Sequence, residues 1–459
     1  MIVMKFGGTS VQDANAIRRV GKIIESRLDR NPAVVVSAMG KITDELLTLA
    51  EAAAKKDRQK MLQSISSIFQ RHENVIAELN ITDDPELMQA LEKARNDLTG
   101  IAEKIFHAGQ LTPHLSDQLV SLGEFLSANI LAAFLRTQNI KGAFVDARDV
   151  IVTDSQFGKA VPLFAESQKR AKVNLEPVLQ QKAVPVLQGF VGMDSYGRTT
   201  TLGRGGSDYS ATFIGSLLKA EEVEIWSDVD GILTADPTLV PEAKRIRFMS
   251  FQEAAELAYF GAKVLHPNTL LPAIERGIPV YVLNSTRPDD SGTLITYNGI
   301  KSRQYVVKSI AYKEDITIIT VTSTRMLMAH GFLATIFDIF DRYQTPVDLV
   351  STSEVSVSMT IDQIGKLQDI CRDLSRFSQV DVEHDKAIVC LVGEGMKNTP
   401  GMATRIFSVL ADVPIHLISQ GASEINISFV IDQNRLQEVV SSLHNKFFSG
   451  ELDPNIFAV

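Results

Sequence analysis

About the first 300 residues alternate short apolar runs with longer amphipathic segments, and this rhythm restricts the possible fold more than any other feature. Apolar runs that end in small or polar residues lie at 32–40, 183–192, 223–231 and 278–285. Segments such as 44–56 and 116–135 have the period of helices. Strands that alternate with helices build a largely parallel sheet covered on both faces, so we predict a three-layer α/β fold. The charged helical stretch 62–108 is expected to be an inserted hairpin of helices.

The remaining residues contain an internal repeat. Four pairs of identical residues each stand 70 positions apart: Gly331 and Gly401, Phe337 and Phe407, Glu354 and Glu424, and Asp362 and Asp432. Each copy is expected to form strand, helix, strand, tight turn and strand, and the two copies to share a sheet. Two unrelated α+β segments are a weak alternative. We place the domains at 1–297 and 305–459, with repeat units at about 315–385 and 386–459.

The composition argues against several classes of protein. A net charge of −9 argues against non-specific nucleic-acid binding. The two cysteines, Cys371 and Cys390, exclude a disulfide scaffold and a thiolate zinc site, and they suit a reducing cytoplasm. No signal peptide and no run of about 18 apolar residues is visible, so we expect a cytoplasmic protein without a membrane partner.

The N-terminal segment MIVMKFGGTSV predicts an anion site. An apolar strand ends at Gly7 and Gly8 directly after Lys5, and a helix follows. Glycine allows backbone N–H groups to approach an anion closely, and a helix N-terminus favours negative charge. A tight turn that merely needs small residues is an equal alternative.

A second glycine-rich segment, TTTLGRGGSDYSA at 199–211, predicts another anion site at the start of a helix. Arg204 lies among its glycines, and Ser207 or Asp208 would cap the helix. The segment lacks the GK pair of phosphate loops and the GxGxxG pattern. A flexible surface loop is the alternative, although it would not need a fixed arginine and aspartate.

Three further signals are individually weaker. Ser227 and Asp228 follow a strand, which suits adenine or ribose recognition or simple turn capping, whereas the spacing does not fit a calcium loop. Lys263 lies near a helix end, where a lone lysine is usually solvated. Glu124 lies on a strongly apolar helix, where a carboxylate is costly unless it is paired or used; a solvent-facing position is the alternative.

This set of residues suits phosphoryl transfer, which depends on positioning and charge neutralisation more than on covalent chemistry. No Ser–His–Asp order and no metal-binding cluster of histidines stands out, so no protein metal site is predicted. His266 lies within a candidate motif, and we expect it to have a packing role.

Four segments resemble the signature segments of aspartokinases in the amino-acid kinase superfamily. They are KFGGTSV at 5–11, TTTLGRGGSDYSA at 199–211, WSDVDGILTADP at 226–237 and FGAKVLHP at 260–267. The repeat resembles the paired ACT domains of these enzymes, and the segment from 331 is most similar to the monofunctional, lysine-sensitive type. The resemblance implies an amino-acid kinase fold followed by two ferredoxin-like ACT domains.

The resemblance also implies an activity. Aspartokinases transfer the γ-phosphate of ATP, with Mg²⁺, to the β-carboxylate of L-aspartate, the first step towards lysine, threonine and methionine. By the resemblance, Lys5 and Asp208 are catalytic, with Lys5 on the γ-phosphate. Substrate contacts are implied for Ser37, Thr43, Glu124 (ammonium) and Arg204 (α-carboxylate), and nucleotide contacts for Lys5, Gly7, Gly8, Ser227, Asp228 and Lys263.

For the paired ACT units the resemblance implies an end-product effector, expected to be lysine, and a homodimer or homotetramer. The implied contacts are Met326, Gly331, Phe332, Leu333, Val347, Asp348, Ser353 and Glu354. A role in dimerisation alone is the alternative. Relatives usually differ at Leu233 and Thr238 near the nucleotide, and at Met328 and Pro346 near the effector.

Three rival functions differ from this interpretation. Another kinase of the superfamily would usually lack the ACT pair and the GRGGSD context. A non-catalytic amino-acid sensor is disfavoured by the intact Lys5, Glu124, Arg204 and Asp208. A fusion to homoserine dehydrogenase fails on length, because the repeat fills most of the residues beyond 305.

Overall fold

The computed structural model describes residues 1–261, 267–299, 306–323 and 330–458. The chain forms two compact units. The first unit contains Met1–Ile232, Arg247–Phe251 and Val264–Asn298, and the second contains Leu233–Ile246, Gln252–Lys263 and Gly299–Val459. Two segments that precede residue 297 therefore pack with the C-terminal repeat.

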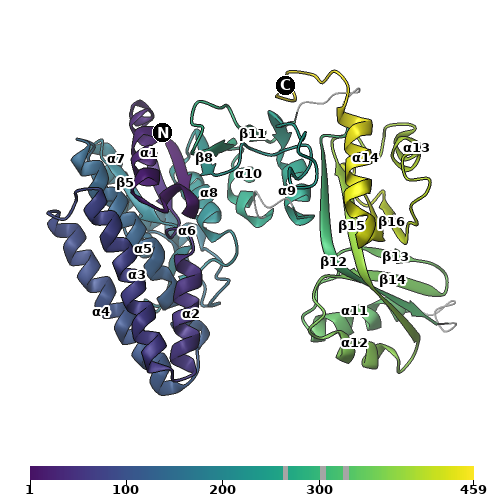
Figure 1. Cartoon of the computed structure of the whole chain (residues 1–459), viewed down its shortest axis with the longest axis horizontal. Helices are drawn as coiled ribbons and strands as arrows, with labels where there is room; N and C mark the ends of the chain where they lie inside the picture. Colours follow the sequence, from purple (N-terminus) through teal and green to yellow (C-terminus); the bar gives the residue numbers. More distant parts are fainter. Residues whose placement is uncertain (262–266, 300–305, 324–329, 459) are drawn as a thin grey trace. The chain divides into compact units, whose positions relative to one another are not determined.

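The first unit is built on an eight-stranded sheet in the order β3-β5-β2-β1-β8-β10-β11-β9. Figure 1 labels β5, β8 and β11 of this sheet. The strands are β1 (Ile2–Phe6), β2 (Ala33–Val36), β3 (Gly142–Phe144), β5 (Val184–Gln188), β8 (Glu222–Ser227), β9 (Phe248–Ser250), β10 (Val280–Asn284) and β11 (Thr293–Thr296). All neighbours pair in parallel except β10 and β11. The predicted mainly parallel sheet is confirmed.

Strand β1 lies in the middle of this sheet and is buried along its whole length. Ile2, Met4 and Phe6 belong to a core that also contains α1 (Ala14–Glu25) and α5 (Pro113–Thr137). Since side chains alternate along a strand, Val3 and Lys5 point to the opposite face, where α8 (Gly206–Leu218) packs. Helices cover both faces, which confirms the predicted three layers.

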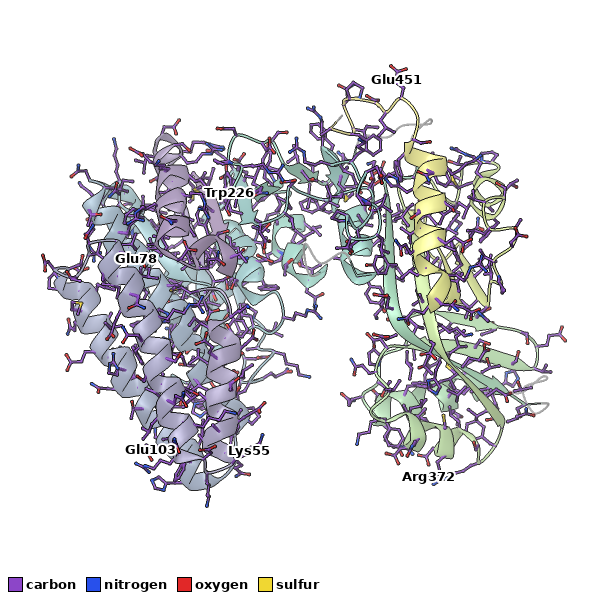
Figure 2. The ribbon with its side chains drawn as sticks, in the orientation of Figure 1. Lys55, Glu78, Glu103, Trp226, Arg372 and Glu451 are labelled. Carbon is purple, nitrogen blue, oxygen red and sulfur yellow. The ribbon has the colours of Figure 1, made fainter. Side chains whose placement is uncertain are left out.

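The predicted hairpin of helices is also present, as α3 (Arg58–Glu78) and α4 (Pro85–Ala108). Their apolar faces join the same core as α2 (Ile42–Ala54) and α5. By length and composition α5 could cross a membrane, but 94% of its apolar window is buried within the protein, as in the core helix of a globular unit. The single tryptophan, Trp226, lies inside the same core (Figure 2).

The first unit also contains a small three-stranded sheet, whose strands come before α8 in the sequence. It consists of β4 (Val152–Thr153), β6 (Val191–Asp194) and β7 (Thr199–Thr201), in the order β4-β6-β7. β6 and β7 form an antiparallel hairpin, and the glycine-rich loop leads from β7 into α8. The remaining helices of this region are α6 (Phe164–Asn174), α7 (Glu176–Gln180) and α10 (Leu271–Ile274).

The second unit contains a six-stranded antiparallel sheet in the order β13-β14-β12-β15-β17-β16. The first repeat supplies β12 (Ser309–Thr322), α11 (Phe332–Arg342), β13 (Val350–Thr352), β14 (Ser356–Ile361) and α12 (Leu367–Leu374). The second supplies β15 (Gln379–Val392), α13 (Met402–Phe407), β16 (Leu417–Gln420), β17 (Asn426–Asp432) and α14 (Leu436–Phe448). β12 and β15 pair directly, so the predicted shared sheet is confirmed. The equivalent Gly331 and Gly401 both have left-handed backbones, with φ of 81° and 77°.

Helix α9 (Phe251–Tyr259) is anchored in the second unit by a fully buried ion pair. Glu253 Oε2 lies 2.8 Å from Lys308 Nζ, and the two side chains are 0% and 1% exposed. Glu253 Oε1 also accepts the backbone N–H of Glu394 at 3.0 Å. Breaking such a pair leaves an uncompensated charge in a medium of low dielectric constant.

We expect Glu253→Ala to lower the free energy of unfolding by about 3–5 kcal/mol, because it leaves the Lys308 ammonium unpaired. Urea unfolding followed by far-UV circular dichroism measures this change. Glu438→Ala, which breaks the exposed ion pair with Arg435 in the same unit, is the matched control and should leave the transition unchanged. Equal transitions for both variants would show that the buried pair contributes nothing specific.

Candidate active site

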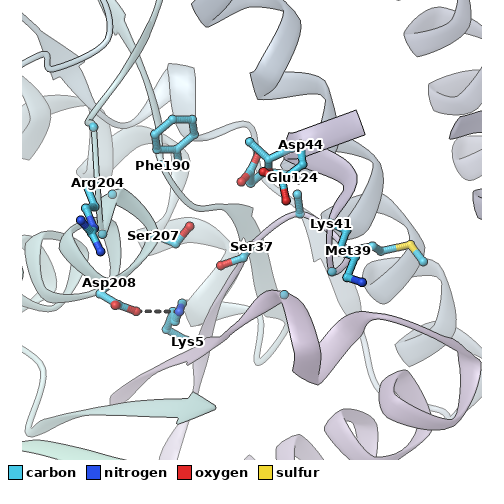
Figure 3. Close-up of a pocket in the computed structure, with 17 residues that line it drawn as sticks. Lys5, Ser37, Met39, Lys41, Asp44, Glu124, Phe190, Arg204, Ser207 and Asp208 are labelled. Atoms are coloured by element: carbon cyan, nitrogen blue, oxygen red, sulfur yellow. Dashed lines mark ion pairs between the residues drawn. The ribbon is translucent and has the colours of Figure 1, made fainter. Parts of the chain in front are cut away.

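A cavity of about 400 Å³ opens at the carboxyl edge of the parallel sheet in the first unit (Figure 3). The turns after β1 and β2, the glycine-rich loop before α8, and helix α5 contribute its walls. Several residues that the sequence singled out line it: Lys5, Gly8, Ser37, Thr43, Glu124, Arg204 and Asp208. Segments far apart in the sequence thus meet at one place.

The ion pair between Lys5 and Asp208 lies in this cavity, as the dashed line in Figure 3 shows. Lys5 Nζ is 2.6 Å from Asp208 Oδ1, and both side chains are mostly buried. Lys5 is fixed by its backbone, because β1 pairs in parallel with β2 on one side and β8 on the other. Asp208 lies in the first turn of α8. The ammonium is therefore held over the start of that helix.

The start of α8 differs from the predicted one. The capping residue is Gly205, with a left-handed φ of 73°, and no side chain caps the helix. The prediction that Ser207 or Asp208 caps it is wrong, because both residues lie inside the helix, and the glycine provides the turn without a side chain. The Asp208 carboxylate is therefore available to Lys5. The helix start, Lys5 and Arg204 together favour an anion.

The glycine pair ties the turn after β1 to both neighbours, Gly7 to β8 and Gly8 to the turn after β2. The backbone N–H of Gly7 donates to the carbonyl of Trp226 at 3.0 Å, and Gly7 does not line the cavity. A Cβ at Gly8 would lie 2.8 Å from the carbonyl oxygen of Ala38, so only glycine fits there. Gly40 N–H donates to the carbonyl of Gly8 at 3.0 Å. A role of either glycine as a donor to phosphate stays a prediction.

Glu124 faces the cavity from the middle of α5 and is only 4% exposed. The solvent-facing alternative is thus excluded. Burial raises the pKa of Glu124 to about 8, although the backbone N–H of Ala38 and the charge of Lys5 both lower it. Its Oε2 atom is buried and has no hydrogen-bond partner. A buried acceptor without a partner at a cavity wall suits a cationic group of a ligand.

Sequence reasoning assigned no role to several residues that line the cavity, among them Lys41, Asp44 and Phe190, and it considered Ser207 only as a helix cap. Lys41 has a left-handed φ of 69° directly before α2. It lies in the turn after β2, between Ser37 and Thr43, which the sequence did single out; Thr43 already belongs to α2. The composition of that turn predicts a polar loop, but it does not say which side chains face the cavity.

Ser227 and Asp228 lie beside this cavity rather than in it. They come at the end of β8, the strand that pairs in parallel with β1, and neither lines the cavity. The Ser227 carbonyl accepts the backbone N–H of Ser285 at 2.8 Å, so the ends of β8 and β10 are held together. Lys263, the third predicted nucleotide contact in this part of the chain, lies outside the described residues.

The predicted effector residues lie on the first repeat of the second unit. Gly331, Phe332 and Leu333 form the start of α11. Phe332 and Val347 pack against the hydrophobic core of the first repeat, to which the buried face of α11 belongs. Ser353 and Glu354 are exposed in the turn between β13 and β14. Met326 lies outside the described residues.

Asp348 is the most constrained of the predicted effector residues. Its Oδ1 lies 2.8 Å from Lys313 Nζ and accepts the hydroxyl of Tyr259 at 3.1 Å. Its Oδ2 is buried without a hydrogen-bond partner. Lys313 also pairs with Asp362 at 2.8 Å. Two carboxylates share one ammonium here, so the cluster has an excess of negative charge.

The raised pKa of Glu124 predicts a pH dependence of stability. The folded state holds this proton more tightly than the unfolded state, whose pKa is near 4.5, so unfolding becomes easier as the pH rises from about 4.5 to about 8. We expect the free energy of unfolding of Glu124→Gln to fall less than that of the wild type as the pH rises through this window. The difference between the two changes is on the order of 3–5 kcal/mol at most. Urea unfolding followed by the fluorescence of Trp226 measures it, and equal pH slopes in both proteins would contradict the assignment.

Known proteins resemble this chain over nearly its whole length. Residues 1–284 match the amino acid kinase family and residues 389–447 match an ACT domain. The chain is 38% identical to the lysine-sensitive aspartokinase 3 of Escherichia coli K12, over 98% of its own length and 99% of that protein.

Two crystal structures of E. coli aspartokinase III are similar as well, both at 37% identity. The complex with aspartate and ADP in the R state has a TM-score of 0.86 and covers 98% of this chain and 100% of that one. The complex with lysine and aspartate in the T state has a TM-score of 0.81 and covers 98% and 99%. The family match, the similarity to these aspartokinases and the gathering of Lys5, Glu124, Arg204 and Asp208 in one cavity agree: the chain belongs to the amino acid kinase family and, within it, to the aspartokinases.

Proposed function

We propose that this chain transfers the γ-phosphate of ATP to the β-carboxylate of L-aspartate and so forms 4-phospho-L-aspartate, the first step of lysine, threonine and methionine biosynthesis. The observation that carries the proposal is the convergence of Lys5, Glu124, Arg204 and Asp208 on one cavity. The kinase activity would reside in residues 1–297 and regulation in 305–459. The reduced cysteines suit a cytoplasmic enzyme.

The charged groups of the cavity match those of aspartate. The Oε2 atom of Glu124, which has no partner, would accept the substrate ammonium. Arg204, whose side chain is exposed at the loop, would bind the α-carboxylate with two parallel hydrogen bonds. Ser37, in the turn after β2, and Thr43, in the first turn of α2, offer hydroxyl groups on the cavity wall. The β-carboxylate would then face Lys5.

The reaction needs charge neutralisation more than proton transfer. An aspartate carboxyl has a reference pKa of about 3.9, so the nucleophile is ionised at neutral pH and needs no general base. The obstacle is the repulsion between the carboxylate and the triphosphate. Lys5, held in place by Asp208 at 2.6 Å, would place its positive charge on the transferring phosphoryl group.

The cavity offers one carboxylate beside Lys5, that of Asp208, and this suits a magnesium ion that arrives with the nucleotide. Among the described residues, no group of three or more His, Cys, Asp or Glu side chains could hold a metal ion. Mg²⁺ is usually bound through one or two carboxylates together with substrate phosphates and water, and Asp208 is the carboxylate beside Lys5. When bound, the ion would neutralise phosphate charge. Gly7, Gly8, Ser227, Asp228 and Lys263 are the proposed nucleotide contacts.

Regulation by lysine is proposed for the first repeat of the second unit. The unpartnered Oδ2 of Asp348 and the excess negative charge of its cluster suit the ammonium of an amino acid. Met326, Gly331, Phe332, Leu333, Val347, Ser353 and Glu354 complete the proposed site. A homodimer or homotetramer formed through the ACT domains would accompany it.

The proposed activity is tested with wild-type protein, ATP and Mg²⁺ in a hydroxamate assay for acyl phosphate, with aspartate against glutamate and acetylglutamate. We expect product with aspartate alone. Lys5→Ala should lower kcat by about 100-fold or more and change the KM for aspartate little, since the lysine acts on the phosphoryl group. Lys104→Ala removes an exposed charge on α4 and is the control. Near-normal turnover of Lys5→Ala would refute the assigned role, and inactive wild-type protein would refute the function.

Lysine is expected to inhibit the wild-type enzyme. Asp348→Asn should raise the lysine concentration for half-inhibition by about 10-fold or more, because a neutral amide binds an ammonium less well than a carboxylate. Turnover without lysine is measured alongside, and threonine, alone and with lysine, is titrated as the competing effector. No response to either amino acid would leave the repeat as a dimerisation device.

A further inference from the structure

Asp117 is a buried carboxylate outside the cavity that makes three hydrogen bonds. It lies on α5 and is 2% exposed. Its Oδ2 accepts the backbone N–H groups of Gly158 and Thr201, both at 2.9 Å, and its Oδ1 accepts the Thr201 hydroxyl at 2.8 Å. Three donors, one from the loop at Gly158 and two from the end of β7, therefore depend on one side chain.

Asp117 and Glu124 lie on the same face of α5. They are seven positions apart, which is about two helical turns. Glu124 faces the cavity, and Asp117 faces the strand that leads into the glycine-rich loop. One rigid helix thus carries both the proposed ammonium ligand and the anchor of that loop.

The loop anchored by Asp117 is the one that carries Arg204. Thr201 is the last residue of β7, three positions before Arg204. The Thr201 carbonyl accepts the backbone N–H of Ala160 at 2.8 Å, so the loop around Gly158 is bound to the same strand. Gly203 packs against that loop, since a Cβ there would lie 3.1 Å from the Gly158 carbonyl oxygen. Arg204 itself makes no ion pair among the described residues.

We propose that Asp117 is a positioning residue that fixes the glycine-rich loop to α5 and thereby sets the distance between Arg204 and Glu124. This inference rests on the proposed function, in which these two side chains bind the α-carboxylate and the ammonium of one substrate. The two groups sit on the same carbon of an α-amino acid. Asp117 therefore acts on aspartate affinity through Arg204, without touching the substrate or the nucleotide.

The chemistry of the three contacts decides which substitution is conservative. In Asp117→Asn, the amide oxygen can accept both backbone N–H groups, and the amide nitrogen can donate to the Thr201 hydroxyl, which also accepts. In Asp117→Ala, all three donors lose their acceptor. Thr201→Val removes the hydroxyl contact alone.

The test measures steady-state kinetics of the full-length variants with aspartate and ATP. We expect Asp117→Ala to raise the KM for aspartate by about 10-fold or more, while kcat and the KM for ATP stay within about threefold. Asp117→Asn should restore the KM to within about threefold of wild type, and Thr201→Val should raise it about threefold. If Asp117→Ala does not fold, an unchanged KM in Thr201→Val overturns the proposal.

Asp194→Ala is the matched control. Asp194 is a buried carboxylate at the other end of the same hairpin, where it accepts from Tyr196, Arg198 and Ser155. The variant Asp194→Ala should leave the KM for aspartate within about threefold of the wild-type value. An equal increase in both alanine variants would show general loosening and overturn the positioning role.

The decisive comparison uses Arg204→Ala. Asp117→Ala should lower kcat/KM for aspartate by about 10-fold in the wild-type background and by less than threefold when Arg204 is already alanine. Equal factors in the two backgrounds overturn the proposal. A wild-type enzyme that does not phosphorylate aspartate refutes the proposed function instead, so the two failures are distinguishable.

Discussion

The ion pair between Lys5 and Asp208 is the interaction on which the arrangement of the site depends. Lys5 belongs to the central strand of a mainly parallel sheet, and Asp208 belongs to the first turn of α8, which packs on the face to which Lys5 points. Their contact holds an ammonium at the positive end of α8 before any ligand arrives. Such preorganisation is what phosphoryl transfer requires, because the protein contributes fixed charge rather than covalent chemistry.

The site residues that could be predicted from the sequence are those marked by a pattern among their neighbours in the chain. Lys5 and Arg204 each stand at a glycine-rich transition from a strand to a helix, and both transitions are readable from apolar periodicity and glycine spacing alone. Glu124 was readable as an anomaly, a carboxylate on an apolar helix. Lys41 was not, because its place on the cavity wall depends on how the turn after β2 meets the turn after β1. The hydrogen bond of Gly7 to Trp226 likewise depends on a strand partner more than 200 residues away.

The repeat was predictable as a pattern, but its contacts were not. The spacing of 70 residues revealed two copies, and the shared sheet and matched glycine conformations follow from it. The packing of α9 within the second unit left no trace in the sequence, since a buried pair such as Glu253 and Lys308 looks like two ordinary charged residues. Through α9, Tyr259 reaches Asp348, so a residue before position 297 belongs to the surroundings of the proposed effector site.

The charges of the cavity explain why a protonated, neutral carboxyl at Glu124 would favour the binding of an anionic ligand. Three cations (Lys5, Lys41 and Arg204) and three carboxylates (Asp44, Glu124 and Asp208) line the cavity, so a fully ionised lining would be neutral. With the pKa of Glu124 raised to about 8, that carboxyl is mostly protonated at neutral pH, and the lining has a net positive charge that attracts an anionic ligand. The ammonium of aspartate would then lower the pKa of Glu124 and release its proton. In the proposed complex, the buried carboxyl would carry its negative charge when the substrate ammonium is present to pair with it.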